Sequence, residues 1–170
     1  ALAQWRFVNS RAAGFEAALL AGFKAPTGRT KEKNDDGEVL DAEFQPGSGS
    51  WDALFGLALT RRVVAWSFDA SALYTVVTEG AQSTDLGDRF NYGIAVSYRV
   101  LGEVEHVHED GHSHKHVSPG PALDLVLELN GEWHAKQEAE GEKDANSGGH
   151  VLYVSPGARL SMEAWSGFVS

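Results

Sequence analysis

The sequence contains no cysteine, so it offers neither a disulfide framework nor a thiolate that could bind a metal or act as a nucleophile. It also lacks any run of about 20 consecutive apolar residues, which excludes a transmembrane helix but not a membrane barrel built from strands. Basic residues are few, with Lys+Arg 14 against Asp+Glu 24 and a net charge of −10, which argues against a nucleic-acid partner. No G-x-S-x-G, H-E-x-x-H or phosphate-binding loop occurs, and we therefore expect no enzyme activity.

A long alternating segment dominates what is present, between residues 51 and 78. Its residues alternate with a period of two, as in a pleated strand. In the first arm one face carries Trp51, Ala53, Phe55, Leu57 and Leu59, and in the second arm one face carries Val64, Trp66, Phe68, Ala70, Ala72, Tyr74 and Val76. We expect these arms to form a hairpin with a tight turn at Arg61–Arg62.

The length of the two arms indicates the kind of sheet. Strands of soluble domains cluster near about 5–6 residues, whereas a tilted strand needs roughly 9–11 residues to cross a bilayer. Both arms reach that length, and each combines an apolar face with a polar or small-residue face, as membrane barrels do. The prediction is therefore an all-β protein, an up-and-down antiparallel transmembrane β-barrel.

Further strand-like segments lie at 2–9, 12–24, 90–100, 122–136, 150–160 and 165–170. The second of these segments is rich in alanine and resembles a helix in composition, but two glycines and the spacing of Phe15 and Phe23 favour a strand. We expect seven or eight strands in a single domain spanning 1–170. Both ends of the sequence look like strands, so we expect this domain to be part of a larger barrel whose export signal is not included.

The connections between these segments alternate in length. Those at 9–12, 61–62 and 161–164 are short, whereas those at 25–50, 79–88 and 137–148 are long and rich in Pro, Gly and charge. Barrels of the outer membrane have short periplasmic turns and long extracellular loops. The connection 101–120 occupies a short-side position although it is long, and we interpret it as a His-rich insertion into a periplasmic turn.

Several stretches, taken in order, resemble a known family. They are GFKAPTGRT, QPGSGSWDALFGLALTRR, FNYGIAVSYRV, ELNGEW and SGGHVLYVSPGARL. Together they are similar to the outer-membrane β-barrel proteins named for the meta-pathway of phenol degradation, a family of transporter-like barrels. The resemblance implies the outer membrane of a Gram-negative bacterium, contact with its lipid, and passage of small compounds, including aromatic or hydrophobic ones. This chain is shorter than the barrel that the resemblance implies.

The two faces of the expected strands define a candidate lumen. Outward-facing residues are predicted to be Phe55, Leu57, Trp66, Phe68, Ile94, Val96, Leu125 and Leu127. The polar residues of the other face are predicted to line the interior: Glu16, Lys24, Asp52, Asp69, Asn91, Arg99, Asp124, Glu128, Asn130, Glu132 and His134. Opposite charges on neighbouring strands should pair, and Arg99 should lie level with Asp124. The interior is then either a packed polar core or the lining of a pore.

A His-rich segment is the sharpest local feature. His106, His108, His112, His114 and His116 alternate with acids in EHVHEDGHSHKH. In an extended segment the residues at i and i+2 point the same way, so His112, His114 and His116 could bind one Zn, Ni, Co or Cu ion. The alternative is a solvated polar loop with weak, adventitious affinity, and we expect no cofactor to be required.

Two further functions remain open at this stage. A soluble lipocalin-like barrel has similar strand number and length, but its apolar faces would turn inward to hold a ligand. A periplasmic metal-binding module would rest on the histidines alone. The sequence leaves the oligomeric state and the substrate undetermined.

Overall fold

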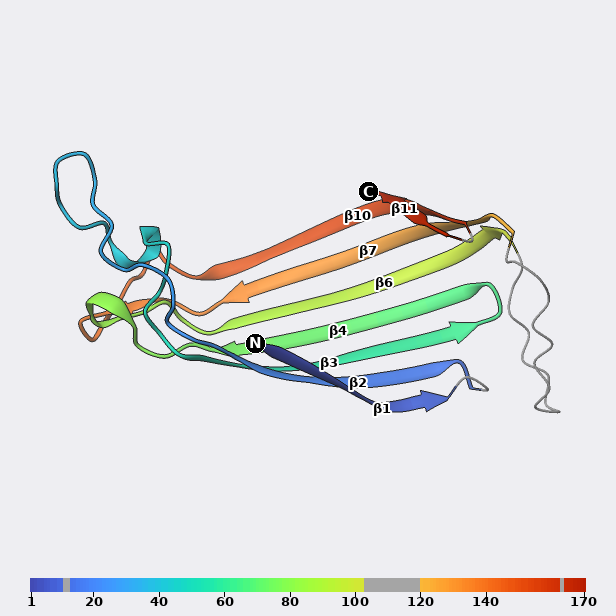
Figure 1. Ribbon diagram of the computed structural model, residues 1–170, viewed down its shortest axis with the longest axis horizontal. Coiled ribbons are helices and arrows are strands. Elements are labelled where there is room, and N and C mark those ends of the chain that lie inside the picture. Colours follow the sequence, from blue (N-terminus) through green and yellow to red (C-terminus); the bar gives the residue numbers. More distant parts are fainter. Residues whose placement is uncertain (11–12, 103–119, 163) are drawn as a thin grey trace.

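The computed structural model describes residues 1–170 except 11–12, 103–119 and 163. Its main feature is one eight-stranded sheet with the order β1-β2-β3-β4-β6-β7-β10-β11, in which every neighbouring pair is antiparallel (Figure 1). The strands are β1 (Leu2–Ser10), β2 (Phe15–Lys24), β3 (Asp52–Val63), β4 (Trp66–Val76), β6 (Arg89–Leu101), β7 (Ala122–His134), β10 (Gly149–Ser161) and β11 (Ser166–Val169). This confirms the predicted all-β, up-and-down antiparallel arrangement and the predicted number of strands.

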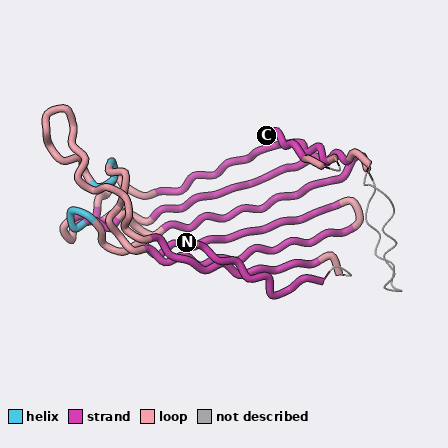
Figure 2. Tube along the Cα trace, in the orientation of Figure 1, coloured by secondary structure: helices cyan, strands magenta, loops and turns pink. Residues whose placement is uncertain are grey.

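The sheet has two outer strands. In the described part of the chain β1 pairs only with β2, and β11 pairs only with β10, so no ladder joins these outer strands to each other. The six strands between them have 10 to 13 residues each. Figure 2 shows these strands running side by side along the long axis of the molecule.

The hairpin of β3 and β4 closes later than the sequence predicts. Val63 pairs with Trp66, so the turn consists of Val64 and Ala65, and the prediction of a turn at Arg61–Arg62 is wrong. The positive φ of Val64, 52°, is unusual for a β-branched residue and gave no turn signal in the sequence. The arginines stay in the strand, where Arg62 Nη1 donates a hydrogen bond of 2.6 Å to Glu16 Oε1 of β2.

Long and short connections lie at opposite ends of the sheet. The long ones join β2 to β3, β4 to β6, and β7 to β10 at the end drawn on the left of Figure 1. The turns of β1–β2, β3–β4 and β10–β11 lie at the other end, where β6 ends at Leu101 and β7 begins at Ala122. The predicted alternation of connections is therefore confirmed, including the short-side position of the ends of the 101–120 segment.

The three long connections form a single hydrogen-bonded layer. Ala81 N donates to Ser48 O at 2.8 Å, and Glu140 N donates to Ser83 O at 3.1 Å, so the second loop touches both others. A small sheet links the second and third loops through β5 (Thr84–Asp85), β8 (Glu138–Ala139) and β9 (Glu142–Lys143). The described helices are the short 3-10 helices η1 (Ala42–Phe44) and η2 (Ala81–Ser83), and neither is long enough to cross a membrane.

Candidate functional site

One face of the sheet collects the polar residues. Residues that lie directly opposite each other on neighbouring strands share a face, and every second residue along a strand returns to it. The register of the sheet places all of the predicted lumen residues on this one face: Glu16, Lys24, Asp52, Asp69, Asn91, Arg99, Asp124, Glu128, Asn130, Glu132 and His134. We call this surface the polar face.

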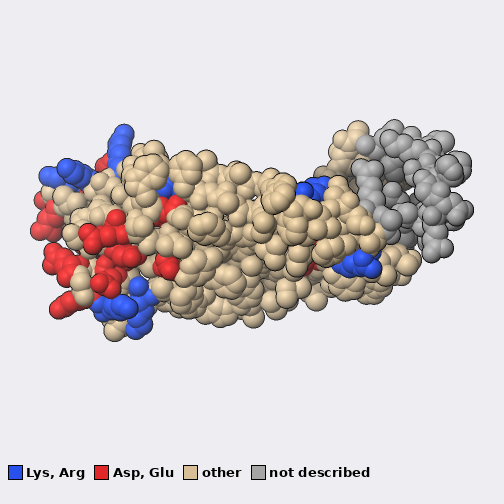
Figure 3. Space-filling model, turned by 90° about the horizontal axis from the view of Figure 1, so that it is seen from below, with Lys and Arg blue, Asp and Glu red and all other residues tan. Residues whose placement is uncertain are grey.

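The opposite face, which we call the apolar face, is exposed. It carries all eight residues predicted to point outward, and seven of them are exposed, with Phe55 and Ile94 at 58% and Leu125 at 52%, while Val96 is half-buried. The space-filling view in Figure 3 shows a broad uncharged surface between a strongly charged left end, formed by the long loops, and a few basic groups on the right.

Aromatic side chains gather near both ends of the apolar face. At the end with the long loops, Tyr74, Phe90 and Trp133 lie in one row across β4, β6 and β7. At the other end Trp66 and Tyr98 lie opposite each other, with ring centroids 4.7 Å apart. The rows between these two groups are mainly aliphatic, with Ile94, Val96, Leu127 and Leu129, and also contain Phe68 and Tyr92.

A buried carboxylate organises the polar face at the short-turn end. Asp124 is 3% exposed and lies between two arginines from the neighbouring strands β6 and β10. Arg99 donates through Nε to Oδ1 at 2.7 Å and through Nη2 to Oδ2 at 3.1 Å, and Arg159 donates through Nη2 to Oδ2 at 3.0 Å. The predicted pairing of Arg99 with Asp124 is present, and Arg159 is a second partner that the sequence analysis missed.

A second group of charged residues of the polar face lies on β1 to β4. Glu16 binds Arg6 at 3.2 Å and Arg62 at 2.6 Å. Asp69 accepts hydrogen bonds from Thr60 at 2.6 Å and from Ser67 at 3.0 Å. Glu16 is thus tied by ion pairs to arginines of both neighbouring strands, whereas Asp69 is held by uncharged hydroxyl groups.

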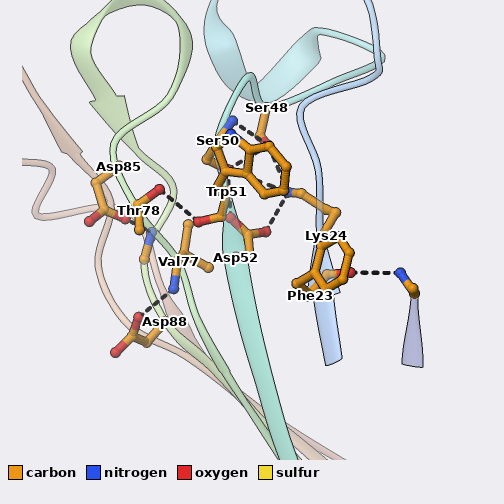
Figure 4. Close-up of polar contacts among 12 residues, drawn as sticks. Phe23, Lys24, Ser48, Ser50, Trp51, Asp52, Val77, Thr78, Asp85 and Asp88 are labelled. Carbon is orange, nitrogen blue, oxygen red and sulfur yellow. Dashed lines mark hydrogen bonds and ion pairs between the residues drawn. The ribbon is translucent and has the colours of Figure 1, made fainter. Parts of the chain in front are cut away.

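At the long-loop end, Lys24 and Asp52 form the third group (Figure 4). The ammonium of Lys24 contacts the carboxylate of Asp52, which is 5% exposed, and also contacts Ser48 Oγ at 2.7 Å. Ser50 is 1% exposed and donates from Oγ to Asp52 Oδ1 at 2.7 Å. The serines join the loop before β3 to the ends of β2 and β3, a role that the sequence analysis missed although both belong to the stretch QPGSGSWD.

Gln45, from the same stretch, closes the base of the first long loop. Its side-chain oxygen accepts from Glu32 N at 2.9 Å, and its amide nitrogen donates to Glu32 O at 3.1 Å and to Leu40 O at 2.6 Å. A single side chain therefore holds two passing segments of the loop. The sequence showed this residue only as part of a motif, because its partners are backbone atoms brought near by folding.

Between the charged groups the polar face is hollow. A cavity of about 420 Å³ lies at mid-height, lined by Asn91, Asn130 and Glu132 together with Leu20, Leu73 and Tyr153. Small residues provide the space, since Ala18, Ala58, Ser71 and Gly93 lie in one row across the sheet. Within the described residues, Glu128, Asn91 and Asn130 make no side-chain hydrogen bond or ion pair, whereas Glu132 is contacted by His134 Nε2.

The predicted metal site lies outside the described residues, because His106, His108, His112, His114 and His116 all fall within 103–119. Elsewhere in the described chain, no group of three or more His, Asp or Glu side chains could hold a metal ion. The prediction of metal binding stays a prediction from sequence.

Comparison with known protein families gives a match over residues 1–162 to the family described as "Putative MetA-pathway of phenol degradation". The chain belongs to this family. No curated protein matches it. Two of the stretches that resemble the family meet in the structure, since a Cβ atom on Gly28 of GFKAPTGRT would lie 2.6 Å from Gly47 Cα of QPGSGSWD. The glycines therefore allow a close backbone contact at the long-loop end.

Proposed function

We propose that this chain forms the wall of an outer-membrane channel of a Gram-negative bacterium, through which small molecules, including aromatic and hydrophobic ones, pass without chemical change. One observation carries the proposal, the separation of the sheet into an exposed apolar face and a polar face that contains a cavity. Membrane barrels have this arrangement because lipid contacts one face and water the other. Membership in the family named for phenol degradation is compatible with this function.

The dimensions of the apolar face support contact with lipid. Trp66 and Tyr74 mark its two aromatic ends on β4, and they are eight residues apart. At roughly 3.3 Å per residue that is about 26 Å along the strand, close to the ~25 Å height of the apolar band of outer-membrane barrels. Aromatic residues at both edges of the band are the expected interfacial anchors.

The polar face supports a water-filled path better than a sealed core. Its carboxylates near the two ends are held by protein donors, whereas the middle combines small residues with Asn91, Asn130 and Glu128, whose side chains make no hydrogen bond or ion pair with the described residues. Asn91 and Glu128 are half-buried and Asn130 is exposed, so water or a solute can reach these polar groups. A lipocalin-like barrel would place Phe55 and Ile94 toward its cavity, but neither residue lines the cavity, and most of the residues that do belong to the polar face.

The positions of the connections support one orientation in the membrane. We place the long loops outside the cell and the 101–120 segment on the periplasmic side, where its histidines would bind Zn, Ni, Co or Cu ions passing through that compartment. Labelling of a Ser113→Cys variant checks the orientation. Modification in intact cells by a reagent that cannot cross the outer membrane would place this segment outside.

Permeation through reconstituted vesicles tests the channel. Liposomes containing the protein should swell in isotonic arabinose faster than empty liposomes. A tryptophan at Ser71, which lines the cavity, should reduce the swelling rate, whereas a tryptophan at the neighbouring Ala70, which lies on the apolar face, should leave it unchanged. Equal swelling of empty and protein-containing liposomes would refute the proposal.

A further inference from the structure

Arg89 differs from the other cationic side chains of the polar face. Each of the others contacts a carboxylate within 3.2 Å, namely Arg6, Lys24, Arg62, Arg99 and Arg159. Arg89 makes no ion pair or hydrogen bond with the described residues, and its Nε atom is buried without a partner. A buried donor that lacks a partner costs more free energy than a hydrogen bond normally contributes, so this position calls for an acceptor.

The carboxylates nearest to Arg89 in sequence and register are engaged elsewhere. Asp88 accepts hydrogen bonds from Tyr74 Oη at 2.7 Å and from Val77 N at 2.8 Å. Glu132 is contacted by the imidazole of His134, the residue that lies directly opposite Arg89 on β7. Among the described residues, the protein itself therefore provides no anion for this guanidinium.

The cavity of the polar face begins two residues after Arg89 along β6. Asn91, two residues after Arg89 on the same face, lines that cavity together with Leu20, Leu73 and Tyr153. The volume of about 420 Å³ falls within the range of small-molecule sites, roughly 300–1,000 Å³. Arg89 does not itself line the cavity, but it lies two residues from Asn91, about 7 Å along the strand. An unpaired guanidinium at this distance from a partly apolar cavity suits a ligand with an anionic head and an apolar body.

We propose that Arg89 and this cavity form a binding site for small carboxylates with an apolar body, with the carboxylate on the guanidinium and the apolar part in the cavity. A guanidinium suits this head group because its planar donors match the two oxygens of a carboxylate. The site deepens the proposed channel function, on which it rests, by giving the pathway a preference for organic acids near its extracellular end.

Calorimetric titration of the full chain in detergent micelles tests the site with two probes of the same shape, benzoate and neutral benzamide. The unaltered protein should bind benzoate at least about tenfold more tightly than benzamide. Arg89→Gln should weaken benzoate about 10- to 100-fold, the range of a hydrogen bond to a charged group, and leave benzamide unchanged. Arg89→Lys, which keeps the charge but not the planar donors, should fall in between.

Arg6→Gln is the matched control, because it removes the same charge from the polar face while Glu16 keeps its contact with Arg62. It should bind benzoate as the unaltered protein does. Equal affinity for benzoate and benzamide, or a loss in Arg6→Gln as large as in Arg89→Gln, would overturn the proposal. The swelling of liposomes in arabinose is measured separately. If the protein speeds this swelling but does not bind benzoate more tightly than benzamide, only the binding site is refuted. If the protein does not speed the swelling, the channel itself is refuted.

Discussion

Replacement of Asp124 by Asn should be the most damaging conservative change on the polar face. The carboxylate is 3% exposed and accepts hydrogen bonds from both Arg99 and Arg159. Asparagine keeps the size but removes the charge that both guanidinium groups face. Breaking a buried pair costs about 3–5 kcal/mol, but these arginines are 33% and 46% exposed and regain water, so we expect a loss of about 2–3 kcal/mol.

Urea unfolding in lipid vesicles, followed by tryptophan fluorescence, measures this loss. Glu128→Gln is the matched control, since Glu128 lies on the same strand and the same face but makes no ion pair among the described residues. It should change the free energy of unfolding by less than about 0.5 kcal/mol. If Asp124→Asn and Glu128→Gln lower the free energy of unfolding equally, the argument that paired charges hold neighbouring strands together is wrong.

Three further predictions follow from the faces, the loops and the histidines. An arginine at Ile94 should lower the free energy of unfolding in vesicles by about 2–4 kcal/mol. An arginine at Ala95, which lies on the polar face between two carboxylates, should lower it by less. Equal losses at the two positions would contradict the assigned faces. Gln45→Ala should open the first long loop to limited proteolysis, and unchanged cleavage would show that its hydrogen bonds do not hold the loop. Replacing the histidines of 106–116 by Asn should abolish Zn²⁺ binding in equilibrium dialysis, and retained binding would place the metal elsewhere.

The strands could be predicted from sequence because apolar residues alternate with polar or small residues along them. Alternation of this kind fixes both the strand and its faces, which is why every predicted polar residue shares one face. The end of β3 was misjudged because Arg61 and Arg62 look like turn residues. Their place in the strand depends on Glu16 and the Ala13 carbonyl of the neighbouring segment, which local sequence does not reveal.

The interior of the site was less predictable. Pairing of Arg99 with Asp124 follows from adjacent strands, but the contact with Arg159 requires the register of β10, which the sequence does not fix. The distinct state of Arg89 could not be foreseen either, since it depends on where the neighbouring carboxylates make their contacts. The small sheet of β5, β8 and β9 consists of two-residue strands, too short for any alternation to be visible.

The side chain of Gln45 fixes the two ends of the outer part of the first long loop, so the length of that part does not affect the remainder of the structure. Because it holds Glu32 and Leu40 together, and Lys33 bridges to Val39, the chain between them leaves and returns at nearly the same point. The entropic cost of closing such a loop rises only slowly with its length. This tip should therefore accept an inserted peptide without disturbing the sheet, and in the proposed orientation such an insert would be displayed at the cell surface.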